Sequence, residues 1–312
     1  MTGLTIIGVL TAFCGGFFGA MIGGLLSFVL MGFVLLAGLF IAISSGNTDF
    51  ITHVAWGPIF GPQVGLLGGA VAAAYAYKRG YYENGKDIAP PLVALKKLDV
   101  LTVGGVAGVI GYLIAELLNL VPRIGFHLDT IAASIALVLI AARLIFGSTG
   151  MTGLRGTGLK TNYDSYRPTK QYFWLPYQST WRDVTVIGAV TGALAALITL
   201  QFLELFPQAA TVVHEFAFAI SAISLFGSVI GAQMPVTHHI TLPAATAASL
   251  VFAATTSATM LPAIAAGIVV GALGAILGNA FARLWLIRGD TLIDPPALTN
   301  AVLLTALSVI FH

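Results

Sequence analysis

Long apolar stretches with few charges fill most of the chain, and short polar stretches separate them. Most of the apolar stretches approach the roughly 20 residues that an α-helix needs to cross the hydrocarbon core of a bilayer. The pattern predicts about ten transmembrane helices, at residues 4–22, 25–44, 59–77, 100–121, 128–147, 184–205, 215–232, 241–260, 262–284 and 297–311. We therefore expect an all-α, polytopic (multi-pass) integral membrane protein.

Two interruptions break this apolar pattern. Residues 53–62 contain a histidine, a tryptophan and two prolines, and residues 231–243 contain two prolines, two adjacent histidines and a glutamine. Proline disrupts a regular helix. Non-helical backbone inside a bilayer is stable only where it is buried in protein or lines a wet cavity. We expect broken helices at both places and a binding site between them.

Composition and charge agree with the membrane class. Of the 312 residues, 58% are hydrophobic and 8% are charged, whereas soluble domains carry about 25% charged residues. The net charge of +2 is too small to suggest a nucleic-acid partner. We expect one transmembrane domain over residues 1–312, in the cell membrane and surrounded by lipid.

Most of the basic residues lie in or beside three polar loops. Loops 78–99 and 148–183 hold most of them, and Arg283 and Arg288 mark a third loop. Lys and Arg concentrate on the cytoplasmic side of membrane proteins. The pattern therefore predicts that these loops are cytoplasmic and that both termini lie outside.

Glycines recur three or four residues apart on several of the predicted helices. Such spacing places small residues on one helix face, where a neighbouring helix can approach closely. We expect these faces to pack other helices, either of the same chain or of a second copy in a homo-oligomer. The glycines are Gly15, Gly19, Gly23, Gly61, Gly65, Gly69, Gly267, Gly271, Gly274 and Gly278.

Internal similarity indicates duplication. Residues 99–122 and 183–207 both run from an aspartate through an apolar stretch to a proline. Internal repeats are common in secondary transporters, whose sites lie between the repeats. We expect halves at 1–147 and 183–312, joined by the cytoplasmic loop 148–182.

Two carboxylates lie within predicted spans. Glu116 and Glu204 are each a turn or two from a helix end. Ionisable groups inside spans are costly and usually functional, which favours a role in coupling transport to a proton or cation. The alternative is that both side chains reach headgroup water at the outer interface. Arg143 is open to the same two interpretations, because its long side chain can snorkel.

The polar side chains at the two breaks are the predicted substrate-binding residues. They are His53, Gln233, Thr237, His238, His239 and Thr241. Histidine titrates near neutral pH, which suits proton sensing. The alternative for the adjacent histidines is a polar loop between two spans.

Motifs for other chemistry are absent or incomplete. The single cysteine, Cys14, excludes an intrachain disulfide. His214-Glu215 resembles the start of a metalloprotease motif, but the residue four positions after His214 is Phe218. Residues 153–161 resemble a phosphate-binding loop with its lysine misplaced. We expect no catalytic residue, no cofactor and no metal.

These observations favour a secondary transporter, or permease, that moves a small molecule or ion across the membrane, coupled to a proton or another cation. The alternative is a non-catalytic membrane subunit of a larger complex, whose glycine faces pack partner helices. An intramembrane enzyme is disfavoured, because no nucleophile or metal set is recognisable.

Overall fold

A computed structural model describes residues 4–121, 127–153, 166–169, 172–255 and 260–311. Within these residues the chain forms helices, turns and two isolated β-bridges, and no strand. The all-helical class predicted from the sequence is thus confirmed for the described part of the chain.

The helices follow the predicted apolar stretches. The first group is α1 (Ile6–Ile22), α2 (Gly24–Ser45), α3 (Gly65–Lys78), α4 (Leu98–Leu120) and α6 (Thr130–Phe146). The second is α8 (Trp181–Leu205), α9 (Phe216–Ser224), α10 (Phe226–Val229), α11 (His238–Ala254), α12 (Leu261–Phe281) and α13 (Pro295–Phe311). Short 3-10 or π turns lie at Ile51–Ala55, Leu92–Leu95, Pro207–Ala209, Val213–Glu215 and Ala282–Leu286.

Four of these helices are long and apolar enough to cross a membrane. They are α2, α4, α8 and the continuous segment Leu261–Leu286. Four further apolar segments are shorter, namely α1, α6, Val213–Val229 and α13. The helices support a membrane protein, and ten crossings stay a prediction.

Helices α1, α3 and α4 pack closely because glycines line their contacts. Gly16 of α1 lies against Gly104 and Gly108 of α4, and a Cβ atom added at Gly16 would collide with the Gly104 carbonyl. Gly68 of α3 meets the backbone of Gly16 and Gly104 at the same place. Such backbone contact is how helices associate in lipid, where the hydrophobic effect adds little.

Helices α8, α11 and α12 form a second group of the same kind. Gly192 of α8 lies against Gly267 and Gly271 of α12, and a Cβ atom added at Gly271 would lie 2.5 Å from the Gly188 carbonyl oxygen. The predicted glycine faces thus meet other parts of the same chain, so these contacts give no support to the predicted homo-oligomer through them.

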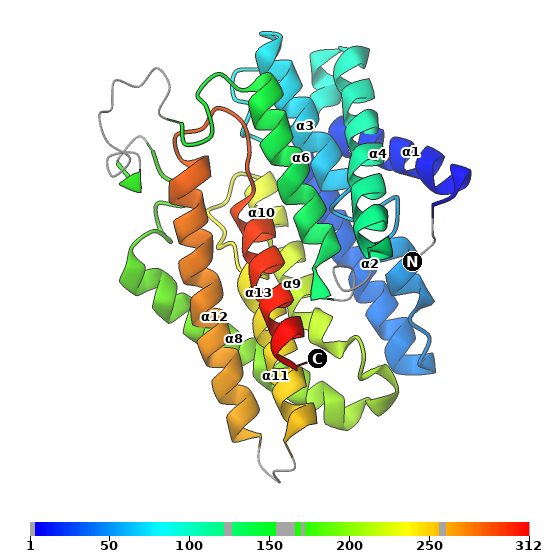
Figure 1. The fold of residues 1–312 in the computed structure, drawn as a ribbon, viewed down its shortest axis with the longest axis vertical. Helices are drawn as coiled ribbons and strands as arrows, with labels where there is room; N and C mark the ends of the chain where they lie inside the picture. The colour runs from blue at the N-terminus through cyan, green and yellow to red at the C-terminus, as the bar shows by residue number, and fades with distance from the viewer. Residues whose placement is uncertain (1–3, 122–126, 154–165, 170–171, 256–259, 312) are drawn as a thin grey trace.

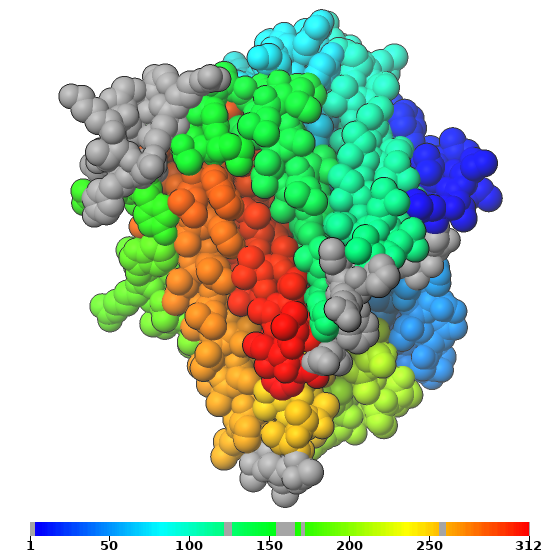
Figure 2. All heavy atoms as spheres, in the orientation of Figure 1, coloured from blue at the N-terminus to red at the C-terminus, as the bar shows by residue number. Residues whose placement is uncertain are grey.

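Two helix pairs join the first half of the chain (α1 to α6) to the second half (α8 to α13). Helices α2 and α9 meet where the rings of Phe28 and Phe218 stack edge to face, with centroids 6.0 Å apart. Helices α6 and α13 run antiparallel: the backbone N–H of Asp129, just before α6, donates to Thr305 Oγ1 near the end of α13. On the face in Figure 2, α13 lies between α6 and α12.

Three connecting segments meet at one end of the molecule, which we call the loop end: residues 79–97, 147–153 and 282–294 (Figure 1). Gly85 forms a parallel bridge with Thr291. These segments belong to the three loops predicted to share the cytoplasmic side. Their proximity agrees with that prediction, and the side itself stays a prediction.

The helices are interrupted at both predicted places. After the π turn, residues 56–64 are non-helical, and residues 230–237 separate α10 from α11. The second break is shorter than predicted, because α11 already begins at His238 and contains Pro243. This proline leaves the His239 carbonyl without its usual helical partner. A Cβ atom at Gly274 would lie 2.8 Å from that carbonyl oxygen, so α12 approaches α11 closely at this point.

Candidate functional site

A cavity of about 820 Å³ lies between helices of the first half of the chain (α1 to α6) and helices of the second half (α8 to α13), and it is the candidate site. Its wall comes from α2, α3, α4, α6, α9, α11 and α13, and from residues of both breaks. A volume of this order suits a small organic molecule, since ligand pockets usually measure about 300–1,000 Å³.

Two aspartates mark the starts of α6 and α13 in this cavity. Asp129 accepts a hydrogen bond from the Ala132 N–H at 3.0 Å, and Asp294 accepts one from the Ala297 N–H at 3.0 Å. Aspartate is a strong N-cap because its carboxylate binds the free N–H groups of the first turn. The helix dipole also favours negative charge at this end. The two aspartates therefore occupy matching local environments.

Two glutamates add to the acidic lining. Glu215 Oε2 accepts a hydrogen bond from Trp56 Nε1 at 3.0 Å, which links the start of α9 to the first break. Glu116 lies on α4 with 9% of its surface exposed. Four carboxylates, on α4 and at the starts of α6, α9 and α13, thus line one cavity.

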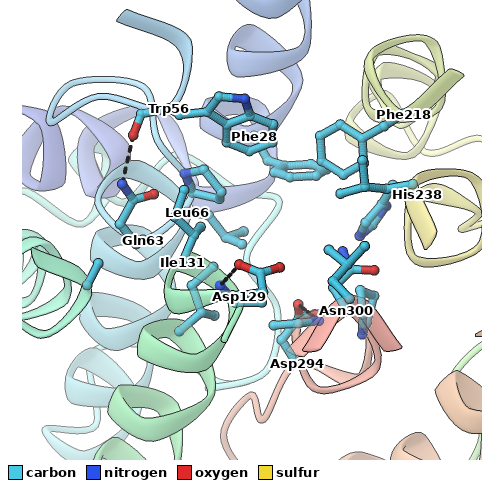
Figure 3. A pocket seen from close by; sticks show the side chains of 18 of the residues that line it. Phe28, Trp56, Gln63, Leu66, Asp129, Ile131, Phe218, His238, Asp294 and Asn300 are labelled. Atoms are coloured by element: carbon cyan, nitrogen blue, oxygen red, sulfur yellow. Dashed lines mark hydrogen bonds between the residues drawn. The ribbon is translucent and has the colours of Figure 1, made fainter. Parts of the chain in front are cut away.

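The opposite side of the cavity is aromatic (Figure 3). Trp56 packs against Phe218 with ring centroids 5.5 Å apart, and Phe28 packs against His238 at 4.8 Å. In the view of Figure 3, these rings lie on one side, and Asp129 with Asp294 on the other. The cavity therefore presents acidic and aromatic walls to the same space.

Three buried polar atoms on the lining have no hydrogen-bond partner among the described residues: Gln63 Oε1, Asn300 Oδ1 and His238 Nδ1. Gln63 is 4% exposed, and Asn300 and His238 are each 8% exposed. Gln63 Nε2 donates to the Trp56 carbonyl oxygen at 2.9 Å, which fixes the direction of its free oxygen. An unpartnered buried polar atom costs about 1–3 kcal/mol, so these atoms are available to accept hydrogen bonds from a molecule in the cavity.

Of the described Lys and Arg residues, Lys86 at the loop end is the one that lines this wall. Its Nζ donates to the carbonyl oxygens of Leu286 at 3.5 Å and Ile287 at 3.3 Å. Burial, together with the nearby Arg143, lowers the pKa of Lys86. Among the described residues, the one ion pair joins Arg143 to Asp290, so no carboxylate of the cavity has an ion-pair partner there.

Some of the residues predicted from the sequence lie at this site. Glu116 and His238 line the cavity, as do Pro58 and Pro62 of the first break. The prediction that the two breaks face a common site therefore agrees with the geometry.

Other predicted residues lie away from the cavity. His53 is exposed, and its Nδ1 lies 3.0 Å from the Asp49 carbonyl oxygen. Gln233 is exposed in the second break, and Glu204 is exposed near the end of α8. Glu204 thus lies on the outer surface of the protein and not beside the cavity. Sequence spacing shows that a helix is broken, but it does not show which side chains point inward.

The remaining predicted residues are buried between helices. Thr237 Oγ1 lies 2.6 Å from Ser221 Oγ. The ring of His239 packs at 5.9 Å from that of Trp174, and Thr241 is buried in the first turn of α11. These side chains hold α11 in place and do not form part of the cavity wall.

The aspartates, Glu215 and the two amides were not predicted as site residues. A usable signal is present for the aspartates, because Asp129 and Asp294 each stand three residues before an alanine at the start of an apolar stretch. This is the pattern of a helix N-cap. It does not show that the helix starts inside the protein, which depends on tertiary structure.

Among the described residues, no group of three or more His, Cys, Asp or Glu side chains is arranged to hold a metal ion. Comparison with known proteins gives no function: no curated protein and no solved structure matches this chain. A family model does match, over residues 1–312. The chain belongs to this family, a family of unknown function (DUF7973).

Proposed function

We propose that this protein is a secondary transporter, or permease, of a small solute in the cell membrane. The observation that carries the proposal is the central cavity, where broken helices from both halves of the chain meet and buried polar atoms have no partner within the described part of the chain. Transporter sites have this character, since they lie near the middle of the membrane where discontinuous helices face each other.

We further propose an inverted internal duplication, which the order and the contacts of the helices support. In the order of the chain, α1, α2, α3, α4 and α6 correspond to α8, α9, α11, α12 and α13, and corresponding helices have corresponding neighbours. Helix α6 ends at the loop end, whereas α13 begins there. Likewise α4 begins at the loop end, and α12 ends there. Five helices in each half would place the halves in opposite orientations in a membrane.

The close contacts repeat residue by residue. Ala20 lies against Gly104 in the first half as Ala196 lies against Gly267 in the second. This pairing matches α1 with α8 and α4 with α12. It differs from the alignment of residues 99–122 with 183–207, which matches α4 with α8.

The cavity wall repeats as well. Asp129 and Asp294 occupy the same N-cap position of corresponding helices. The Gln63 carbonyl faces Gly111, and the His239 carbonyl faces Gly274 in the same way. Halves of this kind can rock about a site between them and open it to each side in turn. Glu116 and the two aspartates are the candidates for coupling to a proton or cation.

Solute flux into proteoliposomes tests the proposal. Purified protein should accumulate at least one member of a broad panel of amino acids, amines, sugars, carboxylates and inorganic ions, faster than protein-free vesicles do. Absence of flux, combined with stoichiometric co-purification of another membrane protein, would favour the alternative of a non-catalytic subunit.

A further inference from the structure

We infer that the solute is a small organic cation that carries a protonated primary amine, bound in the cavity that Asp129, Asp294 and the aromatic wall line. This inference rests on the proposed function, because it names the class of solute for that site. It starts from the balance of charge. Four carboxylates face the cavity, and Lys86 is bound to backbone carbonyls instead of to any of them.

The unpartnered atoms point to a hydrogen-bond donor. Gln63 Oε1 and Asn300 Oδ1 are carbonyl oxygens, which only accept hydrogen bonds. His238 Nδ1 accepts in one tautomer of the ring. A ligand that satisfies them must therefore bring N–H or O–H groups, and an ammonium group brings three. Charge and hydrogen bonding thus call for the same kind of group.

The aspartates are placed where a cationic ligand can reach them. Each caps a helix N-terminus with one oxygen, where the helix dipole favours negative charge. Both are only partly buried, so each carboxylate is accessible from the cavity. An ammonium group placed there would compensate a charge that the described residues leave unpaired.

The aromatic wall favours an organic cation over a bare metal ion. Phe28, Trp56 and Phe218 contribute aromatic rings to the lining, and such rings can attract organic cations and contact their hydrocarbon portion. A cavity of about 820 Å³ is far larger than a metal ion. Within the described residues, no cluster of three potential metal-ligand side chains is present.

Thermal unfolding of the purified full-length protein in detergent tests the inference without relying on transport. We would add, each separately, the amines putrescine and tyramine. Two analogues that carry the ring of tyramine, neutral para-ethylphenol and anionic para-hydroxyphenylacetate, would be added in the same way. A ligand that binds only the folded state raises the unfolding temperature. We expect at least one amine to raise it by several degrees, and neither analogue to do so.

Variants assign the effect to the cavity. Asp129→Asn and Asp294→Asn remove charge but keep a good N-cap, so the variants should still fold. The amine concentration needed for a given shift of the unfolding temperature should rise at least tenfold. Asp183→Asn, at an exposed position of α8, is the matched control and should keep the full shift.

The outcomes separate the inference from the proposed function. If neither amine stabilises the protein, the amine class is overturned, whether or not the anion or the neutral analogue stabilises it. An equal amine shift in the two cavity variants also overturns it. An amine shift that depends on both aspartates, without amine flux in proteoliposomes, supports the site and overturns the transporter.

Discussion

Two groups of buried charged side chains in this molecule are satisfied in different ways. At the loop end, Arg143 donates to the Thr291 hydroxyl at 2.6 Å and to the Thr291 carbonyl, and its Nε lies 3.8 Å from Asp290. In the cavity, Asp129 and Asp294 each bind one backbone N–H and have no ion-pair partner among the described residues. One group is complete within the chain, and the other is not.

The difference separates charge that is satisfied within the fold from charge that is open to a ligand. Burial alone would raise the pKa of Asp290, but hydrogen bonds from Ser148 and Thr149 outweigh it, so the pKa is lowered. This carboxylate is held charged by its own chain. The cavity carboxylates leave room for an external partner, as a binding site requires. Removing charge should therefore unfold the protein at the loop end and spare folding in the cavity.

The largest effect on stability should follow Arg143→Met. The guanidinium joins α6, the loop-end segments and the start of α13, and its loss removes the ion-pair partner of Asp290 and the donor to the Thr291 carbonyl. Breaking a buried ion pair from one side costs roughly 3–5 kcal/mol. We expect a large loss of monodisperse protein in size-exclusion chromatography. Arg182→Met, at an exposed position, should give normal yield. Equal yields from both variants would mean that the loop end is not a structural anchor.

The largest effect on activity should follow the double variant Asp129→Asn, Asp294→Asn. Asparagine caps a helix about as well as aspartate, so the unfolding temperature should change little. Flux of whichever solute the wild-type protein carries should fall by an order of magnitude or more, because the negative charge at both helix starts is gone. Proteoliposome flux and thermal unfolding, measured on the same preparation, check both halves. A variant that unfolds but transports normally per folded molecule would reverse the assignment.

Much of the scaffold can be predicted from the sequence, because it depends on local pattern. Apolar stretches place the helices to within a few residues, and prolines mark both breaks. Glycine spacing marks the close contacts, as at Gly267 and Gly271. Each of these features depends on residues close together in the chain.

The site is less predictable, because it depends on where helices begin in space. Asp129 and Asp294 resemble interfacial caps in the sequence, and only the packing of α6 against α13 turns them toward a cavity. At the first break, His53 faces outward and Gln63 faces the cavity, although the two residues are only ten positions apart in the chain. Backbone direction at a break decides this, and residue type does not.

A moderate effect of opposite sign should follow Asn300→Leu. The variant removes a buried carbonyl oxygen without a partner, so the ligand-free protein should gain stability on the order of 1 kcal/mol. Flux should fall, because an acceptor for the solute is lost. Ile135 occupies the corresponding position of α6 in the proposed duplication, and Ile135→Leu is the control, which should change neither quantity greatly. Lower stability with unchanged flux in Asn300→Leu would show that the amide serves the fold.

The smallest effect concerns Lys86, which lies between the two groups: it lines the cavity, yet it is bound at the loop end. Burial and the nearby Arg143 lower its pKa below the ordinary value of 10.5. Between the lowered pKa and 10.5, the unfolded chain binds more protons than the folded chain, so stability rises with pH across that interval. Burial also raises the pKa of Tyr82 above 10.0, which makes stability fall at higher pH, so the measurement should end near pH 10. We expect the unfolding temperature of the wild-type protein to rise slightly as pH approaches 10 from below, and Lys86→Met to abolish this rise. Lys96→Met, at an exposed position of the same loop, should preserve it. A rise that persists in Lys86→Met would assign the titration to another group and place Lys86 with the satisfied charges.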